Sequence, residues 1–138
     1  MKAEWDILSA QWLDGVRARE TALRLLFLAW YTCSEPVHLT GLDEAALPEG
    51  LIEELFEFLG GEATQDAEFL FVVAVMADVA PWCLGSNERR WEAIGERFWA
   101  RLGGAVPGAE TFLGRGEYGE YFAMQARAVI EAAARPDN

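Results

Sequence analysis

The chain's only histidine lies close in sequence to a cysteine and an acid. His38 follows Cys33 and Glu35 in the segment CSEPVHL. A Cys–His or Glu–His pair could form an activated nucleophile or supply two ligands of a metal ion. One histidine does not complete the usual zinc ligand sets, and a lone histidine in a loop is most often structural. We therefore predict no metal site and no cofactor, and we keep His38 as a candidate pocket residue.

A second chemical candidate is the segment GRGEYGEYF, at 114–122, where glycines flank Arg115. Glycines at the start of a helix allow a close approach to backbone NH groups, which could hold an anion. Two glutamates in the same turn would repel a phosphate, and the spacing matches neither a Walker loop nor a dinucleotide fingerprint. We expect instead that Arg115 pairs with an acid from the middle of the chain, while Tyr118 and Tyr121 pack with their hydroxyls hydrogen-bonded.

Asp78 interrupts the apolar segment FVVAVMADVAPW. A carboxylate buried there needs a partner, such as Arg17 or Arg24 from the first helical region. Alternatively, Asp78 faces a cavity beside an aromatic residue such as Tyr121 or Trp82 and acts as a general acid or base. Structural pairing is the favoured interpretation, and Asp78→Ala is then expected to destabilise the fold.

Acidic residues dominate the middle of the chain. The net charge is −12, and no Lys or Arg occurs between Arg24 and Arg89, where twelve acids occur. Glu49, Glu53 and Glu57 repeat at i, i+4 and i+8 with Glu54 beside them. Like charges at this spacing cost about 0.2–0.5 kcal/mol per pair in a helix, and a basic partner would offset that cost. The simpler interpretation is that these acids keep an apolar-rich chain in solution.

Composition also excludes several partners and locations. The eleven Lys and Arg residues are spread over the two ends of the chain, whereas nucleic-acid binding needs them concentrated. The longest apolar run, 69–77, is too short for a membrane span of about 20 residues. The first residues carry acids where a signal peptide needs positive charge. We therefore predict a cytoplasmic protein in which Cys33 and Cys83, which form no CxxC or Cys/His motif, are free thiols.

The elements that must position these residues are predicted to be helices. Trp91, Ile94, Phe98 and Leu102 follow helical spacing, and proline or double glycine marks several ends. The run FLFVVAV also fits a buried strand, but its polar start and the lack of a hairpin partner favour a helix. The chain, 1–138, is thus predicted to form an all-α, compact single-domain bundle of about five helices. The expected helices span 4–33 (with a possible break at Gly15), 48–59, 66–80, 87–102 and 117–134, with an irregular loop at 103–116.

These features favour a non-enzymatic acidic module. Its expected function is to bind a basic surface of a protein partner through Glu49, Glu53, Glu54 and Glu57, as an inhibitor, immunity-type or adaptor protein would. One alternative is a small helical enzyme or ligand-binding protein with a pocket near Cys33–His38, Asp78 and Gly114–Tyr121. Another is a structural homo-oligomer that uses Trp99, which lies off the main apolar stripe of its helix.

Overall fold

The fold is built from helices joined by short turns. The computed structural model describes residues 1–35, 40–42 and 47–135, and within them there is no strand. The prediction of an all-α fold is therefore confirmed. The α-helices are α1 (Lys2–Leu13), α2 (Arg19–Ser34), α4 (Leu51–Phe58), α5 (Ala67–Val79), α6 (Glu88–Leu102) and α7 (Gly116–Ala134). Short 3-10 helices are η2 (Gly61–Ala63), η3 (Pro81–Cys83) and η4 (Ala109–Phe112).

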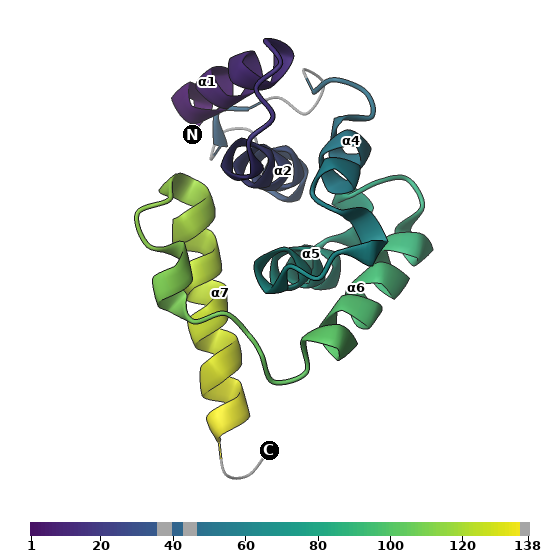
Figure 1. The fold of residues 1–138 in the computed structure, drawn as a ribbon, viewed down its shortest axis with the longest axis vertical. Coiled ribbons are helices and arrows are strands. Elements are labelled where there is room, and N and C mark those ends of the chain that lie inside the picture. The colour runs from purple at the N-terminus through teal and green to yellow at the C-terminus, as the bar shows by residue number, and fades with distance from the viewer. Residues whose placement is uncertain (36–39, 43–46, 136–138) are drawn as a thin grey trace.

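The first helical region is divided at Gly15, as predicted. Gly15 has φ of 93°, in the left-handed region that glycine adopts without steric cost. The chain turns there, and α1 packs across α2 at one end of the molecule (Figure 1). Leu8 and Trp12 are the buried residues of α1, whereas most of its other side chains face solvent.

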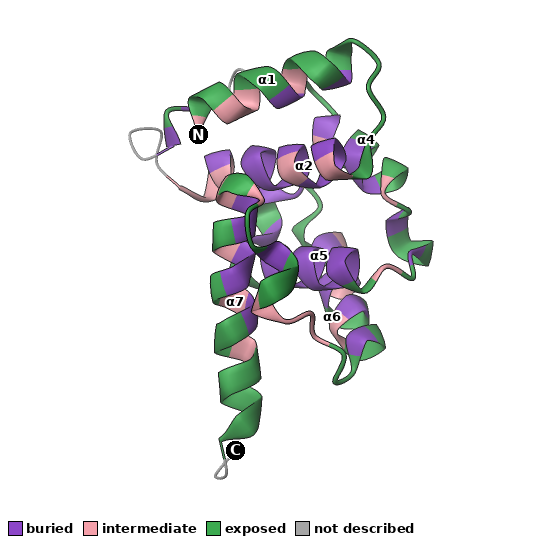
Figure 2. Cartoon of the chain, turned by 60° about the vertical axis from the view of Figure 1, so that its left-hand side comes forward, coloured by how far each residue is buried: buried purple, intermediate pink, exposed green. Residues whose placement is uncertain are grey.

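Helix α5 is the central element and lies between α6 and α7 (Figure 1). Its segment 68–77 is entirely buried, and the carboxylate of Asp66 caps the helix by accepting from the backbone NH groups of Glu68 and Phe69. The apolar run is thus a helix, as predicted. A helix that is apolar on every side must be surrounded by other elements, and Figure 2 shows this burial.

Helix α6 packs closely on α5 through small residues. The side chain of Asn87, where the helix 87–102 was predicted to begin, caps α6, and the buried stripe is the one expected from the sequence: Trp91, Ile94, Phe98 and Leu102. A Cβ atom on Gly95 would lie 2.6 Å from the Cβ of Ala77. Any larger residue at position 95 would therefore push the two helices apart.

The predicted loop at 103–116 contains η4, which crosses α7 closely. A Cβ atom on Gly119 would clash with the carbonyl oxygen of Phe112, so this crossing requires glycine. Gly114 and Gly116 have φ of 70° and 66°, and they shape the turn into α7 as expected. Beyond Ala126 most residues of α7 are exposed, and the end of the helix projects from the rest of the molecule (Figure 2).

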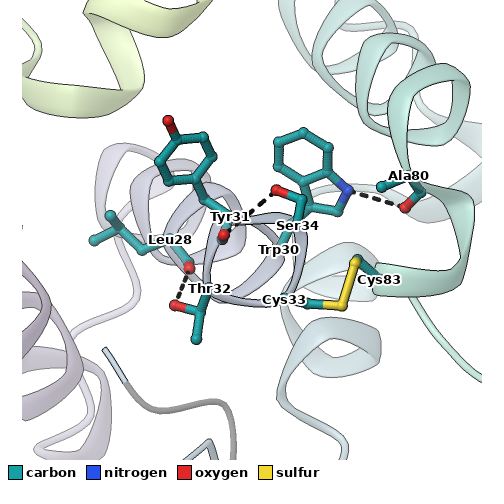
Figure 3. Close-up of a disulfide and its surroundings, with 8 residues drawn as sticks. All are labelled: Leu28, Trp30, Tyr31, Thr32, Cys33, Ser34, Ala80 and Cys83. Atoms are coloured by element: carbon teal, nitrogen blue, oxygen red, sulfur yellow. Dashed lines mark hydrogen bonds between the residues drawn. A yellow bond between two sulfur atoms is a disulfide. The ribbon is translucent and has the colours of Figure 1, made fainter. Parts of the chain in front are cut away.

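The prediction of two free thiols is wrong. Cys33 and Cys83 form a disulfide that joins the end of α2 to η3 across a sequence separation of 50 residues (Figure 3). The Cα atoms are 5.5 Å apart, a usual distance for a disulfide. Trp30 reinforces this junction, because its indole NH donates to the carbonyl oxygen of Ala80 at 3.1 Å.

Candidate functional site

The four acids predicted to form the contact are exposed, and two of them lack an ion pair in the described structure; Glu49 lies before α4, which begins at Leu51 and not at 48, so it is not part of the helical row. Glu53 forms an ion pair with Arg90, and Glu54 lies 3.8 Å from a guanidinium nitrogen of Arg17. The indole NH of Trp12 also donates to Glu54. The charge repulsion inferred from sequence spacing is therefore partly relieved within the fold, by arginines that are distant in sequence.

Asp78 is not buried, contrary to the prediction. It lies in the last turn of α5 and is exposed. Neither predicted partner contacts it: Arg17 lies near Glu54, and Arg24 pairs with Glu20 and approaches Glu4. Asp78→Ala therefore carries no expected penalty from an unpaired buried charge.

The buried acid of α5 is instead Glu68, which was not singled out from the sequence. Its side chain accepts a hydrogen bond from the Tyr118 hydroxyl at 2.5 Å and forms an ion pair with Arg115 at 2.8 Å. Arg115 also binds Glu20 of α2, and Arg19 lies 3.3 Å from Glu68. The predicted pairing of Arg115 with an acid of the middle segment is thus confirmed. This group ties the start of α7 to α2 and α5.

Burial and neighbouring charges set the proton affinities in this cluster. Burial, followed by the charge of Glu68, raises the pKa of Tyr118 far above its ordinary value. The hydrogen bond from Arg115 lowers the pKa of Glu20. Burial also raises the pKa of Tyr31 and of Tyr121, whose hydroxyl is hydrogen-bonded to Gln125. These groups hold one protonation state over the neutral pH range, which suits a structural role.

The tyrosines give a testable pH dependence. All three have a folded-state pKa above 10, so the folded state holds its phenolic protons more tightly than the unfolded state. This contribution to stability is present below pH ~10 and is lost as pH rises above it. In a titration followed at 295 nm, Tyr118 is expected to ionise only when the protein unfolds. Complete ionisation of all tyrosines near pH 10 with unchanged circular dichroism would contradict this.

The residues predicted to share a pocket are not brought together. Cys33 lines one cavity, Asp78 lines a second and Gly114 lines a third. Tyr118 is buried in the Glu68 cluster, and Tyr121 packs in a half-buried position against Phe27, Trp30 and Tyr31. His38 lies outside the described residues.

An open groove of about 330 Å³ between α5 and α6 gathers the most distinctive set of side chains. Ala74, Ala77 and Gly95 are among its lining residues, and their small size lets the two helices approach closely beside it. Trp82 of η3 and Trp99 of α6 also line it. Trp82 is 57% exposed, whereas Trp99 is half-buried and packs edge-on against Phe71.

Four carboxylates give this groove a single sign of charge. Asp78 comes from α5, and Glu88, Glu92 and Glu96 come from successive turns of α6. All four are exposed, none takes part in an ion pair of the described structure, and no Lys or Arg lines the groove. The arginines of α6 that have ion-pair partners, Arg90 and Arg97, bind Glu53 and Glu62 instead. We call this feature the acidic groove.

The chemistry of the acidic groove suits a cation. Carboxylates attract ammonium and guanidinium groups, and an indole face binds them through cation–π attraction of about 0.5–2 kcal/mol. Successive glutamates at a four-residue spacing are about 6 Å apart along a helix, so they can meet a row of cations rather than one. The four-residue spacing of Glu88, Glu92 and Glu96 is present in the sequence, but it was not singled out because arginines lie between these glutamates along the chain.

A larger cavity of about 600 Å³ lies on the other side of η3. Its lining includes both cysteines of the disulfide, Arg90, Glu53 and Trp82. Trp82 therefore borders both this cavity and the acidic groove. Arg90 and Glu53 pair with each other, which leaves Glu49 as one unpaired carboxylate of this lining, against four in the acidic groove.

Within the described part of the chain, no helix combines the length and apolar character needed to cross a bilayer, and no group of three potential ligands is placed to hold a metal ion. No protein-family model, curated protein or solved structure matches the chain.

Proposed function

We propose that this protein is a non-enzymatic binding module that engages a cationic segment of a protein partner, as an inhibitor, immunity-type or adaptor protein does. The observation that carries the proposal is the acidic groove, in which four unpaired carboxylates accompany two tryptophans. The α4 acids contribute less, because Glu53 and Glu54 already have arginine partners. The contact surface expected from the sequence thus moves from α4 to the groove between α5 and α6.

Charge favours a basic protein segment over nucleic acid as the partner. The chain carries a net charge of −12, and within the described residues seven of the eleven basic residues already form ion pairs with carboxylates of the chain. A phosphate backbone would meet repulsion over most of the surface. We also propose a cytoplasmic location: one disulfide in 138 residues is far below the density of small secreted disulfide scaffolds, and the disulfides that do occur in that compartment, where they are rare, are usually transient or redox-sensing.

The test compares two charge-matched variants for binding of a fluorescent octa-arginine peptide. Glu88→Gln/Glu92→Gln/Glu96→Gln removes three groove charges, whereas Glu49→Gln/Glu57→Gln/Glu131→Gln removes three exposed and unpaired charges elsewhere. We expect the groove variant to lose about tenfold in affinity, since exposed pairs contribute about 0.2–1 kcal/mol each. The control variant should lose about threefold or less, through long-range attraction alone.

Two further measurements define the contact. Trp82→Ala should weaken binding severalfold through loss of the cation–π contact, and the affinity of the wild type should fall as salt rises. Equal losses in the two charge-matched variants would show that only net charge matters and would reject the groove as the site. If the α4 acids were the contact, the control variant would lose more than the groove variant.

A further inference from the structure

The disulfide and the acidic groove meet at η3. Trp82, which lines the groove, directly precedes Cys83, which bonds to Cys33. The 3-10 helix η3 has only three residues. Two backbone hydrogen bonds close its turn, from the NH of Cys83 to the carbonyl of Ala80 and from the NH of Leu84 to the carbonyl of Pro81, and so short a helix is not stable by itself. The position of Trp82 therefore also depends on contacts from other elements, and among the described residues the disulfide to Cys33 is the covalent cross-link that holds η3.

The disulfide also borders an open cavity. Both cysteines line the 600 Å³ cavity, and Cys33 is half-buried whereas Cys83 is 6% exposed. This cavity is the route by which a small thiol would approach the bond from the side of Cys33. Disulfides in cytoplasmic proteins are usually transient and redox-sensing, because the thiol pool of that compartment reduces accessible ones.

We propose that the Cys33–Cys83 disulfide is a redox switch that sets the affinity of the acidic groove through Trp82; this inference rests on the proposed function and location. In the oxidised protein the bond holds η3 against the end of α2 and fixes the Trp82 ring at the groove. In the reduced protein the hydrogen bond from Trp30 to Ala80, the residue before η3, remains, but the covalent link beside Trp82 is lost. The Trp82 ring then samples other positions, and a cation loses part of its binding surface.

The chemistry is a two-step exchange with a thiol. A thiolate attacks the Cys33 sulfur, the S–S bond breaks, and the Cys83 sulfur leaves as a thiolate that takes up the proton released by the attacking thiol. A second thiol then attacks the mixed disulfide and releases Cys33 as a thiol. The two reductant molecules are oxidised to one disulfide, and the protein gains two electrons and two protons.

The test measures octa-arginine affinity for the oxidised protein, for the protein reduced with dithiothreitol, and for the reduced protein reoxidised with glutathione disulfide. We expect reduction to weaken binding severalfold, by no more than Trp82→Ala does, and reoxidation to restore it. The control Cys33→Ala/Cys83→Ala should bind with the lower affinity under all three conditions. Equal affinities for oxidised and reduced wild type would overturn the switch.

A second measurement separates this proposal from the proposed function. If even the oxidised protein fails to bind the peptide, the proposed function is wrong, and hydrogen exchange still reports on the switch. Reduction is expected to speed amide exchange in the segment 80–86 at least fivefold while leaving 94–102 of α6 unchanged. Unchanged exchange at 80–86, or equal acceleration in both segments through global unfolding, would overturn the switch.

Discussion

Removing the disulfide in the variant Cys33→Ala/Cys83→Ala is expected to lower the free energy of unfolding by about 4 kcal/mol. The bond closes a loop with a sequence separation of 50 residues, and it therefore restricts the unfolded chain strongly. A domain of this size has a stability of about 5–15 kcal/mol, so the variant should remain folded but become much more sensitive to denaturant. Guanidinium unfolding followed by circular dichroism measures the change.

Reduction provides the matched control for this prediction. Dithiothreitol should destabilise the wild type by a similar amount and should not affect the double-alanine variant. A loss below about 1 kcal/mol would mean that strain in the folded state or residual structure in the unfolded state cancels the loop constraint. The same experiment decides whether the reduced protein is still folded, as a redox switch requires.

The disulfide shows one limit of the sequence-based reasoning. The free thiols were predicted from the inferred compartment and from the absence of a known cysteine motif, and neither observation says which residues are adjacent in space. Adjacency depends on how α2 crosses η3, and this crossing is set by packing, such as the hydrogen bond from Trp30 to Ala80. By contrast, the break at Gly15 and the extent of the helix that begins near Asn87 are local features, and the sequence was sufficient to predict them.

The two acids of α5 show a second limit. Glu68 is buried and Asp78 is exposed, whereas the sequence reasoning placed Asp78 inside and did not single out Glu68. The run between them is apolar on every side of the helix. Its pattern therefore does not reveal which side faces the core and which faces solvent at either end of the helix. The burial of Glu68 depends on Arg115 and Tyr118, which are about fifty residues away in the chain.

The acidic groove was missed for a related reason. Charge was counted along the chain, and the window without Lys or Arg ended just before the arginines of α6. In the structure Arg90 and Arg97 turn toward Glu53 and Glu62, which leaves the glutamates of the same helix unpaired on another side. A helical projection of α6 would have separated Glu88, Glu92 and Glu96 from these arginines.

The second large effect is expected at the buried charge cluster, where Arg115→Met should lower the free energy of unfolding by about 3 kcal/mol or more. The substitution leaves Glu68, which is 8% exposed, without its closest cation. Uncompensated buried charges typically cost 3–5 kcal/mol, and Arg19 at 3.3 Å compensates only in part. Arg127→Met is the matched control, because Arg127 is exposed and belongs to no ion pair of the described structure; it should change stability by less than about 0.5 kcal/mol.

A triple variant distinguishes the cost of an unpaired charge from a loss of packing. Replacing the cluster by apolar residues in Glu68→Leu/Arg115→Met/Tyr118→Phe removes the buried charge together with its partners, and buried ion pairs exchanged in this way are often neutral or stabilising. We therefore expect the triple variant to recover most of the stability lost in Arg115→Met. If it is as unstable as the single variant, the contribution of Arg115 comes from its stem and from its bond to Glu20 rather than from the charge of Glu68. Urea unfolding of the wild type, of Arg115→Met and of the triple variant at pH 7 gives the comparison.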